Sequence, residues 1–192
     1  MARELRRKSI HLLGLVFPIL YVFTTRDTAI IAVGVLLSIA LLSELLKACF
    51  PAFRGIFMRI FSPMLRSQER RGGLTGATYY LIGSFLCLLL FDKTLAIVCL
   101  CFLTLGDLFA ALIGKQWGRI KLFSHKSLEG SLACFIVCTA IALLIGLHPV
   151  VAIVGALVAT LIELLPTGVD DNVTIPLISG LAMHLLISNW QF

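Results

Sequence analysis

Seven long apolar runs dominate this sequence of 192 residues and limit what it can fold into. Most are close to the ~20 residues with which a helix crosses the ~30 Å hydrocarbon core of a bilayer. They lack the alternation of apolar and polar residues that marks a half-buried strand. We therefore predict about seven transmembrane helices, at residues 10–24, 28–46, 73–91, 94–113, 130–147, 149–165 and 173–190.

The composition supports the same class of protein. Hydrophobic residues make up 59% of the chain and charged residues 14%, and the mean hydropathy is +1.03. The core of a water-soluble domain of this length could not bury so much apolar surface. We predict an all-α, polytopic integral membrane protein that forms one domain over residues 1–192 and, in a prokaryote, lies in the cell (cytoplasmic) membrane.

Two other interpretations of the sequence are less favoured. Basic residues before the first run also fit a signal peptide, but Arg26 and Asp27 follow that run without a small-residue cleavage site. The first helix is therefore expected to be retained. Five of the six cysteines lie inside apolar runs, where a thiol behaves as a small hydrophobe, so a disulfide framework is not expected.

The segment at about residues 50–65 has a different pattern. Apolar side chains recur in it at helical spacing, and Arg54 and Arg59 occupy the remaining surface. The apolar positions are Phe53, Ile56, Phe57, Ile60 and Phe61. This pattern predicts an amphipathic helix in the membrane interface, which could also pack on the bundle.

Lys and Arg residues concentrate in alternate loops. They lie before the first run, between the second and third runs, and between the fourth and fifth. The other loops contain only Arg26 and Lys93. Because cytoplasmic loops are enriched in Lys and Arg, the N-terminus is predicted to be cytoplasmic. The net charge of +6 suggests anionic partners, but there is no soluble basic domain to bind nucleic acid.

Acidic residues gather toward the same predicted face. An acid at the centre of a membrane helix costs about 2.5–3.5 kcal/mol, so several of them imply compensation by cations, a metal ion or water. Structural salt bridges are the simpler explanation, and a functional site is the favoured one. The residues concerned are Glu44, Asp107, Glu129, Glu163, Asp170 and Asp171.

Glycines and small residues recur every four positions at Gly106, Ala110, Gly114 and Gly118. On a helix this spacing lets another backbone approach closely. The segment 118–131 that follows also contains basic residues, and its glycines could serve a second purpose.

The second purpose of these glycines could be to form part of a phosphate-binding site. Gly130 and Ser131 begin a helix whose free N–H groups would favour phosphate, and Lys126 precedes them. Asp107, Glu129 and Asp171 offer the hard oxygen ligands that Mg²⁺ prefers. The sequence has neither a Walker motif nor a dinucleotide-binding fingerprint.

At these residues the chain resembles the CTP-dependent lipid-alcohol kinases, comprising dolichol, phytol and polyprenol kinases and the CTP-using diacylglycerol kinases. The matching motifs occur in family order over nearly the whole chain. They are Arg7-Lys8-x-x-His11-x-x-Gly14, Arg71-Gly72-Gly73-x-Thr75-Gly76-Ala77-x-Tyr79, Gly106-Asp107-x-x-Ala110-x-x-x-Gly114-x-x-x-Gly118, Lys126-Ser127-x-Glu129-Gly130-Ser131, and Glu163 with Asp170-Asp171-Asn172 and Pro176. This chain has Leu108-Phe109 where many relatives have a second acid.

The resemblance implies Mg²⁺-assisted transfer of the γ-phosphoryl group of CTP to the hydroxyl of a polyprenol, dolichol or phytol at the cytoplasmic face. For this reaction we expect Asp107, Glu129 and Asp171 to hold Mg²⁺ and Asp170 to accept the hydroxyl proton. Asp170, Asp107 and Lys126 are the expected catalytic residues. The expected nucleotide-binding residues are Lys115, Gly118, Arg119, Lys126, Ser127, Gly130, Ser131 and Asn172. Additional site residues could be Arg7, Lys8, His11, Glu44 and Glu163.

Three alternatives remain at this stage. The substrate could be diacylglycerol, or the chain could be a cytidylyltransferase that makes a CDP-lipid and releases pyrophosphate. A small transporter is the non-enzymatic alternative. It is disfavoured because a transport path needs polar groups near the midplane and beyond, whereas the outer halves of these runs are almost uniformly apolar.

Overall fold

The computed structural model describes residues 12–123, 126–165 and 168–190. Within them, regular structure is helical, apart from one isolated bridge between Lys121 and Ser127. The helices are α2 (Val16–Phe23), α3 (Arg26–Cys49), α4 (Pro51–Phe61), α5 (Ser67–Arg70), α6 (Gly76–Leu90), α7 (Lys93–Cys101), the π-helical turn η1 (Phe102–Gly106), α8 (Asp107–Gln116), α9 (Leu128–Ile145), α10 (Pro149–Leu164) and α11 (Asp171–Trp190). The prediction of an all-α fold is confirmed.

Four helical segments of the described chain are long and apolar enough to cross a membrane. They are Arg26–Cys49, Lys93–Gln116, Leu128–Ile145 and Asp171–Asn189. α6 and α10 are shorter apolar helices, and α2 coincides with the first predicted span. The class of membrane protein is therefore confirmed, while crossing of the bilayer by α2, α6 and α10 stays a prediction.

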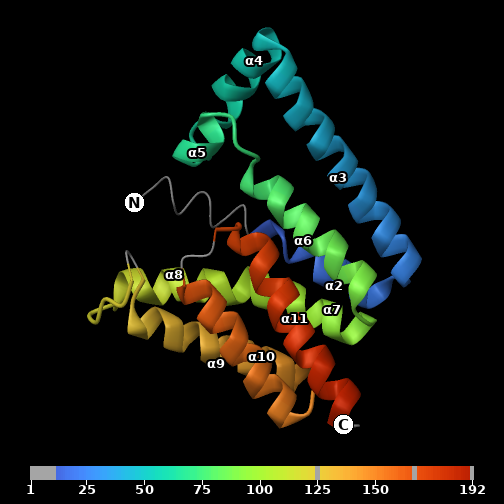
Figure 1. The fold of residues 1–192 in the computed structure, drawn as a ribbon, viewed down its shortest axis with the longest axis vertical. Coiled ribbons are helices and arrows are strands. Elements are labelled where there is room, and N and C mark those ends of the chain that lie inside the picture. Colours follow the sequence, from blue (N-terminus) through green and yellow to red (C-terminus); the bar gives the residue numbers. More distant parts are fainter. Residues whose placement is uncertain (1–11, 124–125, 166–167, 191–192) are drawn as a thin grey trace.

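The helices divide into a bundle and a projecting arm (Figure 1). In the bundle, α9 packs on α8 and α10, and α11 packs on α10, α6 and α7. α3 forms the arm, which runs along α6 and ends at α4 and α5, away from α9 and α10 (Figure 1). The arm therefore contacts the bundle mainly through α6.

Close contact between α8 and α9 follows from the glycine spacing. A Cβ atom added at Gly130 would lie 2.6 Å from the carbonyl oxygen of Ala110 and 3.1 Å from Cα of Gly114. Both atoms belong to the backbone of α8 and cannot move independently of it. The small residues of the four-residue repeat thus let α9 approach α8, as predicted.

α4 begins at Pro51, which is favourable at the first position of a helix because its missing N–H needs no partner there. The rings of Phe57 and Phe61 lie 4.8 Å apart on one face of α4, whereas Ile56 and Ile60 on another face are exposed. The expected amphipathic helix is present, and its place in the membrane interface remains a prediction.

Candidate functional site

A cavity of about 1220 Å³ lies where the arm meets the bundle. Its lining comes from α2, α3, α4 and α6 on one side and from α8, α9, α10 and α11 on the other. Helices distant in the sequence therefore contribute to one space. The sequence-based expectation that acids on separate helices lie near each other holds for Glu44, Asp107, Glu163 and Asp171, which all line the cavity.

One set of lining residues, from α2 and the residues before it, α3, α6 and the segment that begins at α4, is apolar. We call it the apolar wall, and it consists of Leu13, Phe17, Leu36, Ile39, Ala40, Phe57, Phe61, Met64, Leu65 and Leu81. An alkyl or isoprenoid chain would lie against this wall without leaving a polar group unpaired.

A second set, from α8 to α11 and the loop before α9, is rich in charge. We call it the polar wall, and it consists of Asp107, Lys115, Lys121, Lys126, Ser127, Gly130, Ser131, Glu163, Asp171 and Asn172. It combines ammonium groups, which bind phosphate, with carboxylates, which bind protons or hard metal ions.

One helical segment shows the change from apolar to polar along its length. Leu103, Asp107 and Lys115 all line the cavity from the continuous segment of η1 and α8. At about 1.5 Å per residue, Asp107 and Lys115 are separated by roughly 12 Å along the helix axis. Asp107 therefore lies between the apolar contacts of Leu103 and the cation of Lys115.

The π-helical turn η1 ends directly before Asp107. Thr104 in this turn lies 3.2 Å from the hydroxyl of Tyr80, which donates to the carbonyl oxygen of Gly14 at 2.9 Å. A π-helical turn changes the direction in which the following side chains point, and such turns are frequent at functional sites. Tyr80 thus connects α6 and the residues before α2 to the turn that orients Asp107.

Lys126 is held by acids from two helices. Its ammonium nitrogen lies 2.8 Å from Oε1 of Glu163 and 3.8 Å from Oδ2 of Asp171. It also donates to the backbone carbonyl of Glu163. The carboxylate of Asp107 adds a third negative charge near those of Glu163 and Asp171. The polar wall therefore concentrates negative charge around one lysine.

Asp170 lies beside this cluster but has different partners. Its Oδ2 accepts from Nη1 of Arg66 at 2.6 Å, and its Oδ1 accepts from the backbone and side chain of Asn172 at 3.0 and 2.7 Å. Asp170 is not among the residues that line the cavity. Its carboxylate caps the start of α11 and fixes Arg66.

Two buried carboxylates hold the start of α6. Oε1 of Glu44 accepts from the backbone N–H of Thr75 at 2.8 Å, and Oε1 of Glu69 accepts from that of Gly76 at 3.1 Å. Anions are favourable at this end of the helix because of the helix dipole. Glu44 also pairs with Lys47, which donates to the carbonyl oxygen of Gly73.

Glu129 lies outside the cavity lining. Its carboxylate accepts from the backbone N–H groups of Arg119 and Ile120 at 2.9 and 3.2 Å, which fixes the loop before α9. The N–H of Gly130 donates to Ser127 Oγ at 3.2 Å, and that of Ser131 to the carbonyl oxygen of Ser127 at 3.0 Å. The amides expected to bind phosphate are therefore engaged within the protein.

The predicted site residues thus fall into three groups. Asp107, Lys115, Lys126, Ser127, Gly130, Ser131, Asp171, Asn172, Glu44 and Glu163 line the cavity. Gly118, Arg119, Glu129 and Asp170 do not. Arg7, Lys8 and His11 lie outside the described residues.

Sequence reasoning gave no site role to Arg66, Glu69, Tyr80 and Lys121, which also line the cavity. The motif around Thr75 and Gly76 could have drawn attention to Glu69 and Arg66 just before it. Within the described residues, no three His, Cys, Asp or Glu side chains could together hold a metal ion. The predicted Mg²⁺ site therefore stays a prediction.

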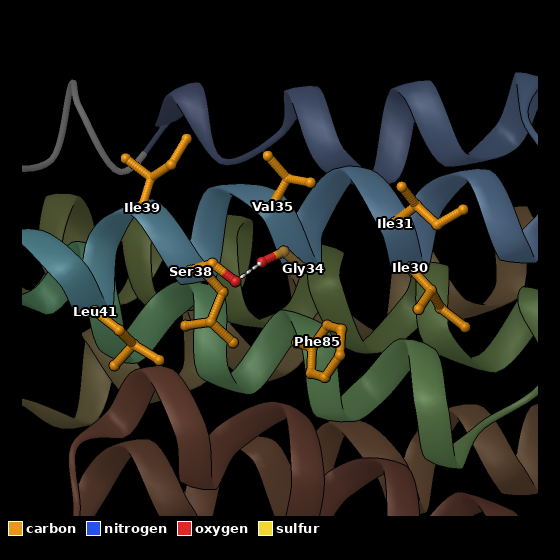
Figure 2. Close-up of a pocket in the computed structure, with 9 residues that line it drawn as sticks. Ile30, Ile31, Gly34, Val35, Ser38, Ile39, Leu41 and Phe85 are labelled. Carbon is orange, nitrogen blue, oxygen red and sulfur yellow. Dashed lines mark hydrogen bonds between the residues drawn. The ribbon is translucent and has the colours of Figure 1, made fainter.

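A second hollow, along α3 and α6, has no such chemistry. Ile30, Ile31, Val35, Ile39 and Phe85 surround it (Figure 2). The hydroxyl of Ser38 donates to the carbonyl oxygen of Gly34 in the same helix (Figure 2). This apolar groove is suited to contact with acyl chains and offers no reacting group.

Three relatives have sequences similar to this chain. An uncharacterized protein of Rickettsia prowazekii is 29% identical over 184 residues, covering 91% of this chain and 90% of that protein. The CTP-dependent diacylglycerol kinase 1 of Schizosaccharomyces pombe is 26% identical over 168 residues, covering 77% and 76%. A probable chloroplastic phytol kinase of Triticum aestivum is 32% identical over 146 residues, covering 65% and 48%. The chain is a homologue of the CTP-dependent lipid kinases.

The similarity to CTP-dependent lipid kinases that the sequence motifs predict is thus confirmed. No family model matches the chain, and no solved structure matches it. The chain spans about three quarters of the Schizosaccharomyces pombe homologue and about half of the Triticum aestivum homologue.

Proposed function

We propose that this protein is a CTP-dependent kinase that phosphorylates the hydroxyl group of a membrane lipid alcohol at the cytoplasmic face. The names of its homologues support a phosphotransferase that acts on a lipid alcohol. The observation that best supports this reaction in the structure is the single cavity with one apolar and one polar wall. It offers an apolar surface for a lipid tail and cations for a nucleotide within one space.

In this proposal the lipid oxygen attacks the γ-phosphorus of CTP. A bond forms between that oxygen and phosphorus, the bond from phosphorus to the β–γ bridging oxygen breaks, and CDP leaves. Phosphoryl transfer depends mainly on positioning and on neutralisation of charge. The proposed function of Lys115, Lys121 and Lys126 is to neutralise the phosphates of the nucleotide, since all three line the polar wall.

Mg²⁺ fits this wall as a partner of the nucleotide. Proteins usually bind Mg²⁺ through one or two carboxylates together with substrate phosphates, so a complete protein site is not needed. Asp171 lines the cavity next to Lys126, and we assign the metal contact to it. When bound, Mg²⁺ would neutralise phosphate charge during transfer. Glu129 is less suited because its carboxylate holds the backbone of residues 119 and 120.

The proton of the lipid hydroxyl needs an acceptor at the boundary between the walls. We assign this role to Asp107, which lies between Leu103 and Lys115 on the same helical segment. Asp170, the acceptor expected from the sequence, is bonded to Arg66 and Asn172. We propose that Asp170 orients Asn172 and pairs with Arg66 while no phosphate group is bound to this arginine.

The acceptor is proposed to be an isoprenoid alcohol of the polyprenol, dolichol or phytol type, in keeping with the phytol kinases among the homologues. Diacylglycerol is the second candidate, because homologues named as diacylglycerol kinases also match the chain. Both present a hydroxyl at the level of the lipid head groups with the tail below it.

The test is to incubate the purified protein with CTP or ATP and a panel of lipid alcohols, followed by mass spectrometry of the lipid product. A lipid monophosphate and CDP are expected. Formation of a CDP-lipid with pyrophosphate would identify a cytidylyltransferase instead. Absence of any product with the whole panel, from protein that is folded in nanodiscs, would exclude the proposed kinase activity.

A further inference from the structure

Arg66 lies where the cavity changes from apolar to polar. The segment that begins at α4 contributes Phe57, Phe61, Met64 and Leu65 to the apolar wall and then Arg66 to the same cavity. A lipid whose tail follows these apolar side chains would have its head group near the guanidinium. Arg66 is thus the cation that the segment after α4 contributes to the cavity lining.

The backbone of Arg66 is fixed by contacts that do not involve its guanidinium. Its N–H donates to Oε2 of Glu69 at 3.0 Å. The other oxygen of Glu69 accepts from the N–H of Gly76 at 3.1 Å. Because Glu69 is only 7% exposed, these bonds tie Arg66 firmly to the start of α6. The side chain therefore extends from a fixed point.

The guanidinium keeps access to the cavity. Nη1 donates to Oδ2 of Asp170 at 2.6 Å, and Nε lies 3.9 Å from Oε1 of Glu69. The side chain is still 38% exposed. A guanidinium has five N–H donors in a planar fork that matches two phosphate oxygens at once. The contact with Asp170 uses part of that capacity, so a phosphate group would compete with this carboxylate for the fork.

Arg66 and Lys126 meet the same acidic pair. Arg66 binds Asp170, and Lys126 lies 3.8 Å from the next residue, Asp171. The positive charges of Arg66 and Lys126 both attract the carboxylate of Asp171. The two cations therefore approach one region, Arg66 from the segment after α4 and Lys126 from the loop before α9.

We propose that Arg66 binds the phosphate group on the lipid side of the reaction, both during transfer and in the lipid monophosphate product. This inference rests on the proposed kinase function. The phosphate would replace Asp170 as the partner of the guanidinium, and Arg66 would donate hydrogen bonds without forming or breaking a covalent bond. Lys126 would stay with the phosphates of the departing CDP.

A difference between product and substrate binding follows from this role. The lipid alcohol has no charge for Arg66 to meet, whereas its monophosphate has two oxygens that fit the fork. Loss of the guanidinium should weaken binding of the monophosphate and leave binding of the alcohol almost unchanged.

The experiment measures dissociation constants in nanodiscs for phytol and phytyl monophosphate, and for dioleoylglycerol and dioleoyl phosphatidate. For Arg66→Gln, binding of the preferred monophosphate should weaken at least about tenfold, and binding of its alcohol should change less than about twofold. Arg66→Lys keeps the charge but not the fork, so an intermediate loss of about threefold or more is expected. Arg59→Gln, an exposed arginine of α4 outside the cavity lining, is the matched control and should change neither constant.

Asp170→Asn separates phosphate binding from a purely structural ion pair. It removes the competing anion and retains Arg66, so the monophosphate should bind more than about twofold more tightly than to the unmodified protein. If Arg66→Lys and Asp170→Asn both leave the ratio of the two dissociation constants within about twofold of the unmodified protein, the inference is wrong. Arg66→Lys keeps the test decisive if Arg66→Gln does not fold. Failure of the kinase proposal would be seen separately, as absence of turnover by the unmodified protein.

Discussion

The ammonium nitrogen of Lys126 lies 2.8 Å from Oε1 of Glu163, and this pair connects the loop before α9 to the end of α10. Glu163 is only 5% exposed, whereas the Lys126 side chain is 31% exposed. The pair can therefore serve two purposes. It compensates a buried carboxylate, and it keeps an accessible cation in the cavity.

These two purposes can be separated by paired substitutions. Lys126→Gln should reduce stability by about 1–3 kcal/mol, because it leaves Glu163 buried beside Asp171 without its lysine. It should also lower kcat by about 10²–10³, the usual cost of losing a group that stabilises transition-state charge. The double change Lys126→Gln with Glu163→Gln should restore stability without restoring turnover. Thermal unfolding in detergent and CTP turnover are measured on the same samples, and recovery of both would mean that Lys126 has only a structural role.

The dependence on Mg²⁺ should distinguish Asp171 from Asp107. Asp171→Asn removes the proposed metal contact, so the Mg²⁺ concentration for half-maximal rate should rise about tenfold or more. Asp107→Asn removes the proposed proton acceptor, so kcat should fall by about 10²–10⁴ at an unchanged Mg²⁺ requirement. Both are read from Mg²⁺ titrations at saturating CTP.

Glu129→Gln is the control for that titration. Its carboxylate holds the backbone of Arg119 and Ile120, so this change should lower thermal stability and leave the Mg²⁺ requirement unaltered. A rise in the Mg²⁺ requirement equal to that of Asp171→Asn would instead support the ligand set expected from the sequence.

The sequence was sufficient to predict the helices and the meeting of their acidic ends. In a bilayer every backbone polar group needs an internal partner, so long apolar runs have few alternatives to a helix. Successive spans alternate in direction, which brings the end of α3, the start of α11 and the end of α10 to one side. Glu44, Asp171 and Glu163 line one cavity for this reason.

Side-chain direction could not be predicted in the same way. Asp170 and Asp171 are adjacent in the sequence, yet one binds Arg66 and the other lines the cavity. The π-helical turn before Asp107 leaves no distinct pattern of apolar residues. Arg66 precedes a helix of four residues and Glu69 lies within it, and this helix is too short for periodicity to reveal. Such contacts depend on packing between distant segments.

The aromatic side chains of α4 should affect the lipid more than the nucleotide. Phe57 and Phe61 line the cavity, so changing both to Ala should raise the KM for the lipid alcohol about tenfold while the KM for CTP changes less than about twofold. Ile60→Ala on the exposed face is the matched control and should leave both constants unaltered. An equal rise in both constants would contradict a contact with the lipid tail.

Membrane orientation can be tested by labelling single cysteines in a variant without the six natural ones. Phe123→Cys lies in the loop between α8 and α9, and His148→Cys lies at the start of α10. The distribution of Lys and Arg predicts that an impermeant reagent modifies the first from the cytoplasmic side and the second from the other side. Modification of both from the same side would rule out this orientation.

The contact between α8 and α9 should depend on the absence of a side chain at Gly130. A Cβ atom there would lie 2.6 Å from the carbonyl oxygen of Ala110, so Gly130→Ala must push the two helices apart. The free energy of unfolding is expected to fall by about 1–3 kcal/mol, as at other overpacked positions. The matched control is Gly55→Ala in α4, where a Cβ atom would meet nothing within 4 Å. This change should raise the free energy of unfolding by about 0.5–1 kcal/mol.

Thermal unfolding of the two alanine variants measures this difference in stability. Their kinetics with CTP show whether the contact between α8 and α9 also affects turnover. Separation of α8 from α9 would move Asp107 and Lys115 relative to Ser127, so kcat of Gly130→Ala should fall even where the protein remains folded. If the N–H of Gly130 instead bound phosphate directly, the alanine variant would keep that N–H, but its methyl group would obstruct the approach of the phosphate. Equal melting temperatures for the two variants, with only the KM for CTP raised in Gly130→Ala, would therefore favour direct phosphate binding over helix packing.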